Sequence, residues 1–94
     1  MGRCAVSASP AQIANDMSMH AAFWAKRDRR IERACRDAAR VIRSYLDGQA
    51  VDGRTFRGVW GRLLDLERPS TRVHGYPDFT RARLCLDDLK AGRA

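Results

Sequence analysis

The chain has 94 residues and a formal net charge of +7, from 18 basic and 11 acidic residues. This length fits one small domain and leaves no room for a two-domain enzyme. Ile, Leu, Val and Phe total only 18 residues, and much of the 45% apolar content comes from 14 alanines. So few large aliphatic side chains predict that a partner or a second copy supplies part of the buried surface.

The sequence also argues against several classes of protein. No apolar run is long enough to cross a membrane, and residues 1–8 lack the apolar segment of a signal peptide, so we interpret them as a flexible tail before one helical domain over 9–94. Cys4, Cys35 and Cys85 form no C-x-x-C pair, which indicates a reducing cytoplasm. No residue spacing predicts a metal site or a nucleophile with its base. We therefore expect no enzymatic activity, cofactor, metal or membrane association.

Residues 9–47 carry the strongest helical pattern in the chain. Ser9 and Gln12 fit a capping box, Pro10 suits the first helical position, and Gly48 predicts the C-terminal end. One stripe recurs at helical spacing through the whole stretch. Its members are Ile13, Met17, His20, Trp24, Ile31, Ala34, Cys35, Ala38, Val41, Ile42, Tyr45 and Leu46.

This stripe allows two interpretations. Either one helix runs from 10 to 47, or two helices meet at a hinge near Asn15–Ser18 or Lys26–Arg29. A continuous helix would be about 57 Å long, which is too long for a compact monomer of this size. The stripe over residues 10–27 would then need a partner, and we therefore predict a homodimer.

Two shorter helices are predicted after a loop at 48–53, over 54–67 and 79–91, with a further loop at 68–77 between them. Gly58 and Gly61 in the first indicate either close packing against another helix or a weak helix. Asp78 is the expected cap of the second, and Gly92 its stop. The expected inward residues are Phe56, Trp60, Leu63, Leu64, Phe79, Ala82, Leu86 and Leu89, closing on Ile31, Ala38, Val41, Ile42 and Tyr45. The predicted fold class is all-α.

The first candidate site is an arginine stripe opposite the apolar one. It consists of Arg29, Arg33, Arg36, Arg40 and Arg43, which fall within about 80° on a helical wheel. Three interpretations are open: a solvated face paired with Glu32 and Asp37, a nucleic-acid site, or a site for an acidic protein. Five neutralised phosphates would give a log–log salt slope of about −4.5. The six-residue joint at 48–53 does not fit a helix-turn-helix motif.

The second candidate site is the aromatic start of the long pattern. Met, Trp and Arg are enriched at protein interfaces, and a charged Arg27 inside the apolar stripe suits a partner's carboxylate. The alternative is an ordinary core stripe. The predicted partner-binding residues are Met17, His20, Phe23, Trp24, Arg27, Arg30 and Ile31.

An Arg-rich, all-helical chain of this plan, with an exposed cluster over Met17–Trp24, resembles the small helical antiactivators of bacterial quorum-sensing transcription factors. The resemblance covers the general plan of residues 10–91 and implies a regulator that binds and blocks a transcription factor. We accordingly expect a cytoplasmic, non-enzymatic regulator that inhibits a protein partner through its N-terminal helix face. The alternative is a sequence-tolerant nucleic-acid-binding protein that uses the arginine stripe.

Overall fold

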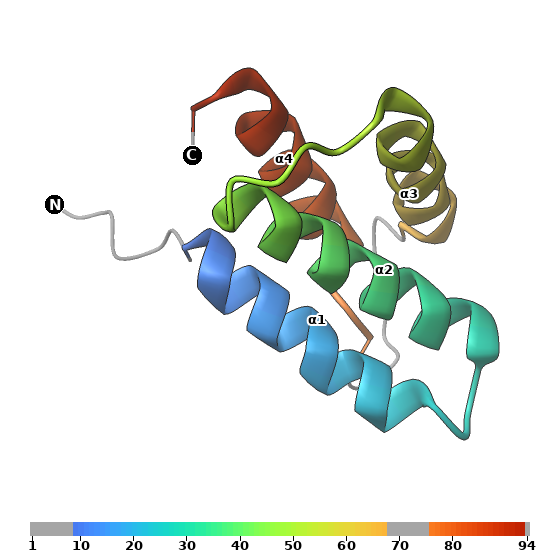
Figure 1. The fold of residues 1–94 in the computed structure, drawn as a ribbon. Coiled ribbons are helices and arrows are strands. Elements are labelled where there is room, and N and C mark those ends of the chain that lie inside the picture. The colour runs from blue at the N-terminus through green and yellow to red at the C-terminus, as the bar shows by residue number, and fades with distance from the viewer. Residues whose placement is uncertain (1–8, 68–75, 94) are drawn as a thin grey trace, which may run out of the picture.

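The structure, a computed structural model, describes residues 9–67 and 76–93 of the chain. These residues form four helices and no strand, so the predicted all-α fold class is confirmed (Figure 1). The predicted tail at 1–8 and most of the predicted loop at 68–77 lie outside the described residues.

The first long pattern forms two helices, α1 (Pro10–Trp24) and α2 (Arg29–Leu46), so the continuous-helix interpretation is wrong. The predicted capping box is present, since Gln12 N donates to Ser9 Oγ at 3.2 Å and Ser9 N donates to Gln12 Oε1 at 2.9 Å. The break at residues 25–28 follows from a second cap. The Asp28 side chain accepts from two backbone N–H groups of the first turn of α2, which starts a new helix in a new direction.

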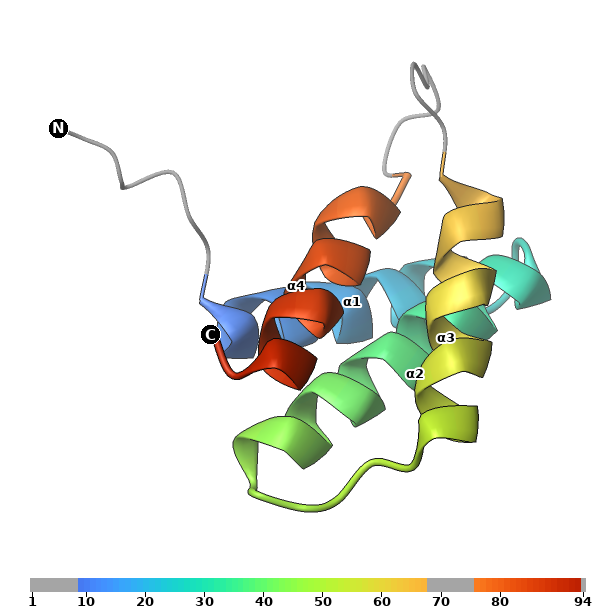
Figure 2. The same ribbon diagram turned by 90° about the horizontal axis from the view of Figure 1, so that it is seen from above.

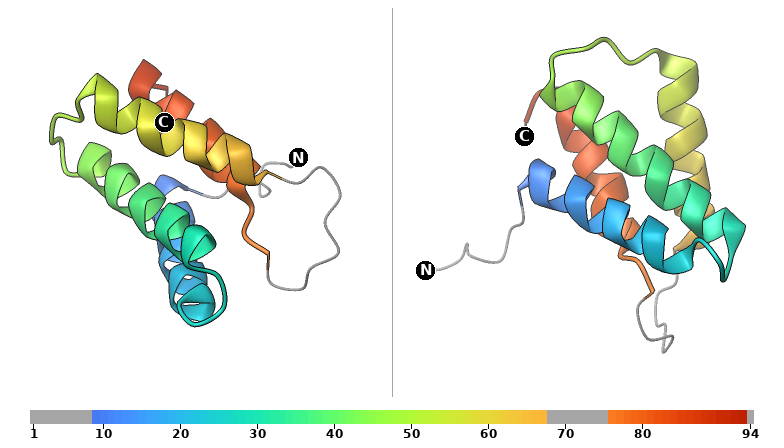
Figure 3. Two further views of the ribbon diagram at one scale, coloured as in Figure 1. Left: turned by 90° about the vertical axis from the view of Figure 1, so that its right-hand side faces the viewer. Right: turned by 60° about the horizontal axis from the view of Figure 1, so that its bottom comes forward.

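Because α2 folds back beside α1, the two helices cover each other's apolar stripes (Figure 1, and Figure 3, right). Six of the 19 buried core residues are Ala, and five of those belong to this helix pair. Small side chains let helices approach closely. The alanines therefore form much of the interface between α1 and α2, although the chain has few large aliphatic residues. The predicted homodimer depended on an uncovered stripe at residues 10–27. Because α2 covers that stripe within the same chain, the argument for a homodimer no longer applies, and the homodimer stays an untested prediction.

Helices α3 (Gly53–Leu66) and α4 (Phe79–Ala91) match the two shorter predicted helices to within one residue. Asp52 and Asp78 cap their N-termini, and Gly92 ends α4 in the left-handed conformation at φ +77°. Gly48 adopts φ +76° just after α2, which only glycine does at little cost. The close-packing explanation of Gly58 and Gly61 is wrong, because a Cβ at either position would meet no atom within 4 Å.

The helices form two layers, with α3 and α4 antiparallel to each other and laid across α1 and α2 (Figure 2). The core between the layers contains most of the residues predicted to face inward, including Phe56, Leu63, Phe79 and Leu86. Trp60 and Leu89 pack against it half-buried. The placement of Leu64 in the core is wrong, because its side chain is 45% exposed; Val59 and Leu66 fill the core in its place.

Candidate binding surfaces

The structure divides the predicted partner-binding set into buried and exposed residues. Met17 and Ile31 are core residues, only 1% and 6% exposed, and neither can contact another molecule in this conformation. The side chains of Phe23, Arg27 and Arg30 are exposed. The stripe that the two buried residues share therefore serves the fold, and only its outer flank is left for a partner.

The exposed flank of α1 forms a small surface that we call the α1 patch. It consists of the apolar Met19 and Phe23 with the polar Asp16 and His20. These four side chains line a shallow hollow of about 230 Å³. Met19 is 64% exposed and Phe23 is 42% exposed. Met19 was missed from the sequence because it lies off the apolar stripe, although its spacing of four from Phe23 places both on one face.

The aromatic ring of Phe23 is held from two sides. The Arg27 guanidinium lies 4.2 Å from the ring centroid and donates to the backbone oxygen of Phe23 at 3.0 Å. Trp24 meets the ring edge-on, with centroids 5.7 Å apart, and itself packs half-buried against the core and against Tyr76. Trp24 is thus part of the fold, whereas Arg27 covers an exposed ring as a cation–π contact.

The arginine stripe lies on the outward side of α2, and all five of its side chains are exposed. Arg36 pairs with Glu32, and Arg40 Nη2 lies 3.2 Å from Asp37 Oδ1. Among the residues that the structure describes, Arg29, Arg33 and Arg43 have no carboxylate oxygen within 4.0 Å. These three exposed arginines are free to meet water or a ligand, so the solvated-face, nucleic-acid and acidic-protein interpretations all stay open.

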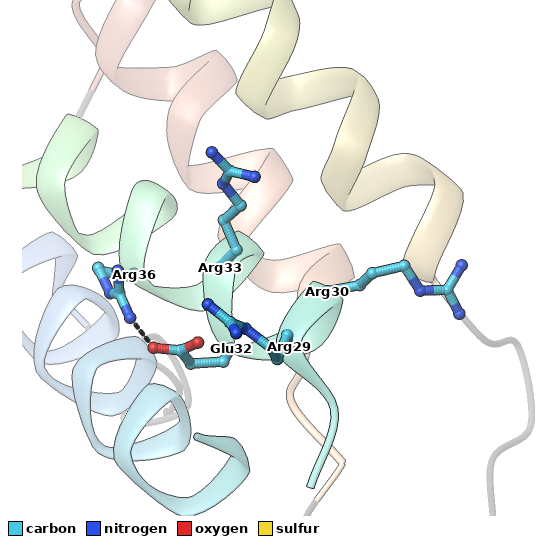
Figure 4. Close-up of a pocket in the computed structure, with 5 residues that line it drawn as sticks. All are labelled: Arg29, Arg30, Glu32, Arg33 and Arg36. Atoms are coloured by element: carbon cyan, nitrogen blue, oxygen red, sulfur yellow. Dashed lines mark ion pairs between the residues drawn. The ribbon is translucent and has the colours of Figure 1, made fainter. Parts of the chain in front are cut away.

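The first half of the stripe surrounds a hollow of about 310 Å³ on the surface of α2 (Figure 4). Four arginines and Glu32 line it. Arg36 turns toward Glu32, whereas Arg30 and Arg33 extend away from that ion pair. The hollow is open among long side chains of one helix, so it is a basic surface with one acidic residue at its edge.

Net positive charge is concentrated in this part of the molecule. Residues 26–43 include eight basic and three acidic residues, whereas the rest of the described residues include seven basic and eight acidic ones. The basic character is therefore strongest in α2 and the turn before it, and the charges of the other described residues nearly cancel in sum.

Three other arginines connect different helices, and we call them the seam arginines: Arg62, Arg81 and Arg83. Arg62 Nη1 lies 2.7 Å from Asp37 Oδ2, which joins α3 to α2, and Arg81 Nη2 lies 3.2 Å from Asp16 Oδ2, which joins α4 to α1. Arg83 pairs with Glu67 next to the C-terminus of α3. Hydrogen bonding from Arg83, followed by Thr80, holds the pKa of the Glu67 carboxyl below its ordinary value.

Cys35 and Cys85 are buried free thiols. Burial raises the pKa of Cys35 to about 12, and burial with the nearby Asp88 charge raises the pKa of Cys85. Both thiols are therefore kept in the unreactive protonated form. Within residues 9–67 and 76–93, no group of three or more His, Cys, Asp or Glu side chains is placed to share a metal ion. In the same ranges, no helix has the length and hydropathy needed to cross a bilayer.

No protein-family model, curated protein or solved structure matches this chain. The resemblance to antiactivators stays a prediction.

Proposed function

We propose that this protein is a small non-enzymatic binding protein that attaches to nucleic acid through the arginine stripe of α2. The observation that carries this proposal is the position of Arg29 and Arg33, which have no carboxylate partner in the described part of the chain and lie in its most strongly basic segment, residues 26–43. Arginine is well suited to this role, because its planar guanidinium binds phosphate through two parallel hydrogen bonds.

Fold stability does not account for Arg29 and Arg33. Arg29 lies in the first turn of α2, at the positive end of the helix dipole, where a cation is unfavourable. Arg33 follows four residues later, and like charges at that spacing repel each other. Asp37 lies four residues after Arg33, but its two carboxylate oxygens pair with Arg40 and Arg62. By contrast, Arg36 and Arg40 have ion-pair partners on their own helix, and Arg43 lies in the last turn, where the dipole favours a cation. A ligand that carries negative charge explains the first two positions.

The predicted strength follows from the number of phosphates neutralised. Three arginines without ion pairs set a lower bound, with a log–log salt slope of about −2.7, and all five give about −4.5. Dissociation constants of sequence-independent binding are typically about 10⁻⁴ to 10⁻⁶ M at physiological salt. Binding in this range is measurable by fluorescence anisotropy.

The test compares two double variants with equal loss of charge. R29Q/R33Q removes two arginines from the stripe, and R54Q/R57Q removes two exposed arginines from α3. Affinity for a labelled 20-base-pair duplex is measured from 50 to 200 mM KCl. We expect R29Q/R33Q to weaken binding about 60-fold at 0.1 M salt and to make the slope less negative by about 2. The R54Q/R57Q control should stay within about threefold of the natural protein, because its arginines lie outside the stripe.

Two results would contradict the proposal. Equal losses in both variants would show that only total charge matters, and a slope near zero would show that phosphates are not contacted. Far-UV circular dichroism of both variants verifies that helix content is unchanged.

A second candidate function is favoured by the α1 patch. Exposed Met19 and Phe23 beside a hollow, with Arg27 fixed at the rim, are suited to an apolar side chain of a protein partner that is flanked by carboxylates. In that case the protein acts as the sequence predicted, as a cytoplasmic regulator that inhibits a protein such as a transcription factor. The buried thiols Cys35 and Cys85 are compatible with a reducing cytoplasm.

The variant M19A/F23A tests this second candidate. Both side chains are exposed, so helicity and thermal stability should change little while binding to a co-purified partner is lost. Trp24 is left in place, because its contacts with the core would mix a folding defect with a binding defect. Retained binding by M19A/F23A would eliminate the patch as the site.

A further inference from the structure

The arginine stripe is long enough to reach several phosphates of a duplex backbone. Arg29 and Arg43 are 14 residues apart on one helix, a distance of about 21 Å along its axis. Over that length a duplex presents about six phosphates on each strand. Because each strand winds by about 200° around the duplex axis over that length, about two or three phosphates of a strand face the straight row of arginines at one time.

The stripe is also rigid at its base. The side chains on the opposite face of α2, including Ala34, Cys35, Ala38 and Ile42, are fully buried against the other helices. The Cα positions of the arginines are thus fixed, and only their side chains adjust. A fixed, convex row of charges matches a regular array of phosphates, whereas a flexible single strand is usually held in a groove.

The surface lacks the aromatic residues that bind single strands. All seven aromatic residues of the chain lie in the described part, and none is on the outward face of α2. Phe56 and Phe79 are buried, and four others pack half-buried against the core. Phe23 alone is exposed, and Arg27 already lies 4.2 Å from its ring centroid. Stacking of successive bases, which dominates single-strand binding, has no platform here.

Arginine reads guanine only from within the major groove, so sequence selection by the stripe requires α2 to enter that groove. The chain has only three amide side chains, Gln12, Asn15 and Gln49, and none of them is on α2, so the usual reader of adenine is missing. Helix α2 lies between α1 on one side and α3 on the other (Figure 3). These neighbours keep α2 from entering a groove deeply, which leaves its arginines at the level of the phosphates.

From these four observations we infer that the ligand of the arginine stripe is duplex nucleic acid, bound through its backbone phosphates without sequence preference. This inference rests on the proposed function, and it adds the strandedness and the lack of sequence selectivity.

Four labelled probes of equal length test the inference: two 20-base-pair duplexes of unrelated sequence and one single strand from each, chosen without self-complementarity. The natural protein is titrated with each at 100 mM KCl. We expect the two duplexes to bind within about twofold of each other, and each single strand at least tenfold more weakly. R29Q/R33Q should weaken duplex binding about 60-fold, and R54Q/R57Q should not.

The results separate this inference from the proposed function. Equal or tighter binding of the single strands, with the same loss in R29Q/R33Q, overturns the duplex inference and keeps the nucleic-acid function. A tenfold difference between the two duplexes overturns the lack of sequence preference in the same way. If no probe binds, both the duplex inference and the nucleic-acid function are overturned. In that case, binding to phosphatidylserine vesicles that is lost in R29Q/R33Q would assign the stripe to a membrane surface instead.

Discussion

The arginine stripe of α2 and the seam arginines show how position decides the role of one residue type. Arg36 and Arg40 of the stripe keep 62% and 67% of their side chains exposed, and their acidic partners lie one turn away on the same helix. The seam arginines are between 17% and 42% exposed, and their main partners lie on, or next to, other helices. Ion pairs between helices fix the packing of the layers, and Arg40 takes part in one of them because it shares Asp37 with Arg62. In the described residues, Arg29 and Arg33 contribute charge without joining helices.

The same difference extends to the surroundings of the two groups. Arg83 lies 5.1 Å from the ring centroid of Trp60, whose indole N–H donates to Asp87 at 2.9 Å, so it belongs to a partly buried network between α3 and α4. Arg29 and Arg33 are part of no such network in the described residues. A substitution should therefore destabilise the fold in the seam and change only binding in the stripe.

The largest effect on stability is expected for Arg83→Gln. This change leaves Glu67 half-buried with only Thr80 as a partner, and we expect the free energy of unfolding to fall by about 2 kcal/mol. R29Q/R33Q should leave it unchanged or raise it by a few tenths, since repulsion along α2 is relieved. Urea denaturation of both variants checks this, and a larger loss in R29Q/R33Q would reverse the comparison. Arg81→Gln is the milder seam control, because its more exposed pair contributes about 1 kcal/mol or less.

The inner face of α2 gives the next largest effect. The unfolded Cys35 thiol ionises with a pKa near 9.0, whereas burial holds it near 12 in the folded protein. Because the pKa is higher in the folded protein, the protonated thiol contributes its full stabilisation below pH 9. This stabilisation is lost progressively as the pH rises from 9 to 12. Between pH 8 and pH 10 the free energy of unfolding should therefore fall by about 1.4 kcal/mol from this residue.

Cys35→Ala isolates that contribution, because Cys85 and the tyrosines titrate in both proteins. The difference between the two proteins in the pH dependence of urea denaturation should be about 1.4 kcal/mol from pH 8 to pH 10. Parallel pH profiles would show that the thiol meets water and that the inner face of α2 is not dry.

Helix α3, which carries one seam arginine, has two glycines in its interior, Gly58 and Gly61, besides Gly53 at its start, whereas α2 has none. Gly58→Ala should stabilise the fold by about 1 kcal/mol, because nothing lies within 4 Å of the added Cβ. Gly48→Ala should do the opposite by about 1 kcal/mol, since alanine is strained at φ +76°. Thermal denaturation of the two variants provides the measurement. If Gly48→Ala also stabilised the fold, the turn after α2 would have changed to a conformation that alanine adopts without strain.

The smallest effect concerns the acidic residue at the edge of the stripe. Glu32→Gln frees Arg36 and removes a negative charge beside the hollow. The salt slope for duplex binding should become more negative by up to about 1. An unchanged slope would show that Arg36 remains away from the ligand, and that the stripe binds through Arg29 and Arg33 without it.

Local signals in the sequence were sufficient for the helices and for the stripe. The Ser9 capping box, the α4 boundaries at Phe79 and Ala91 and the left-handed Gly92 all follow from chemistry within a few residues, which is why they were predictable. The stripe was equally predictable, because a helical wheel places Arg29 to Arg43 on one side wherever the helix lies.

Other features depended on contacts that no local pattern specifies. Leu64 and Leu66 both fit an apolar face of α3, and the direction from which α2 and α4 approach selects Leu66. Asp28 is an ordinary N-cap residue, yet the apolar register continues across it, so periodicity alone left open both a single helix and a hinge near Asn15–Ser18 or Lys26–Arg29. The pairing of Asp37 with Arg62, 25 residues away, was likewise invisible to spacing rules within one helix.

The sequence by itself thus determined the all-α class, the caps and the row of arginines, because each depends on interactions within one or two helical turns. Only the tertiary structure decided what those surfaces face. By folding α2 back on α1, it buried Met17 and Ile31, covered the stripe that had suggested a dimer, and left Arg29 and Arg33 without partners among the described residues. The physical reason is that burial and ion pairing are decided by which helices meet, and that depends on the whole chain.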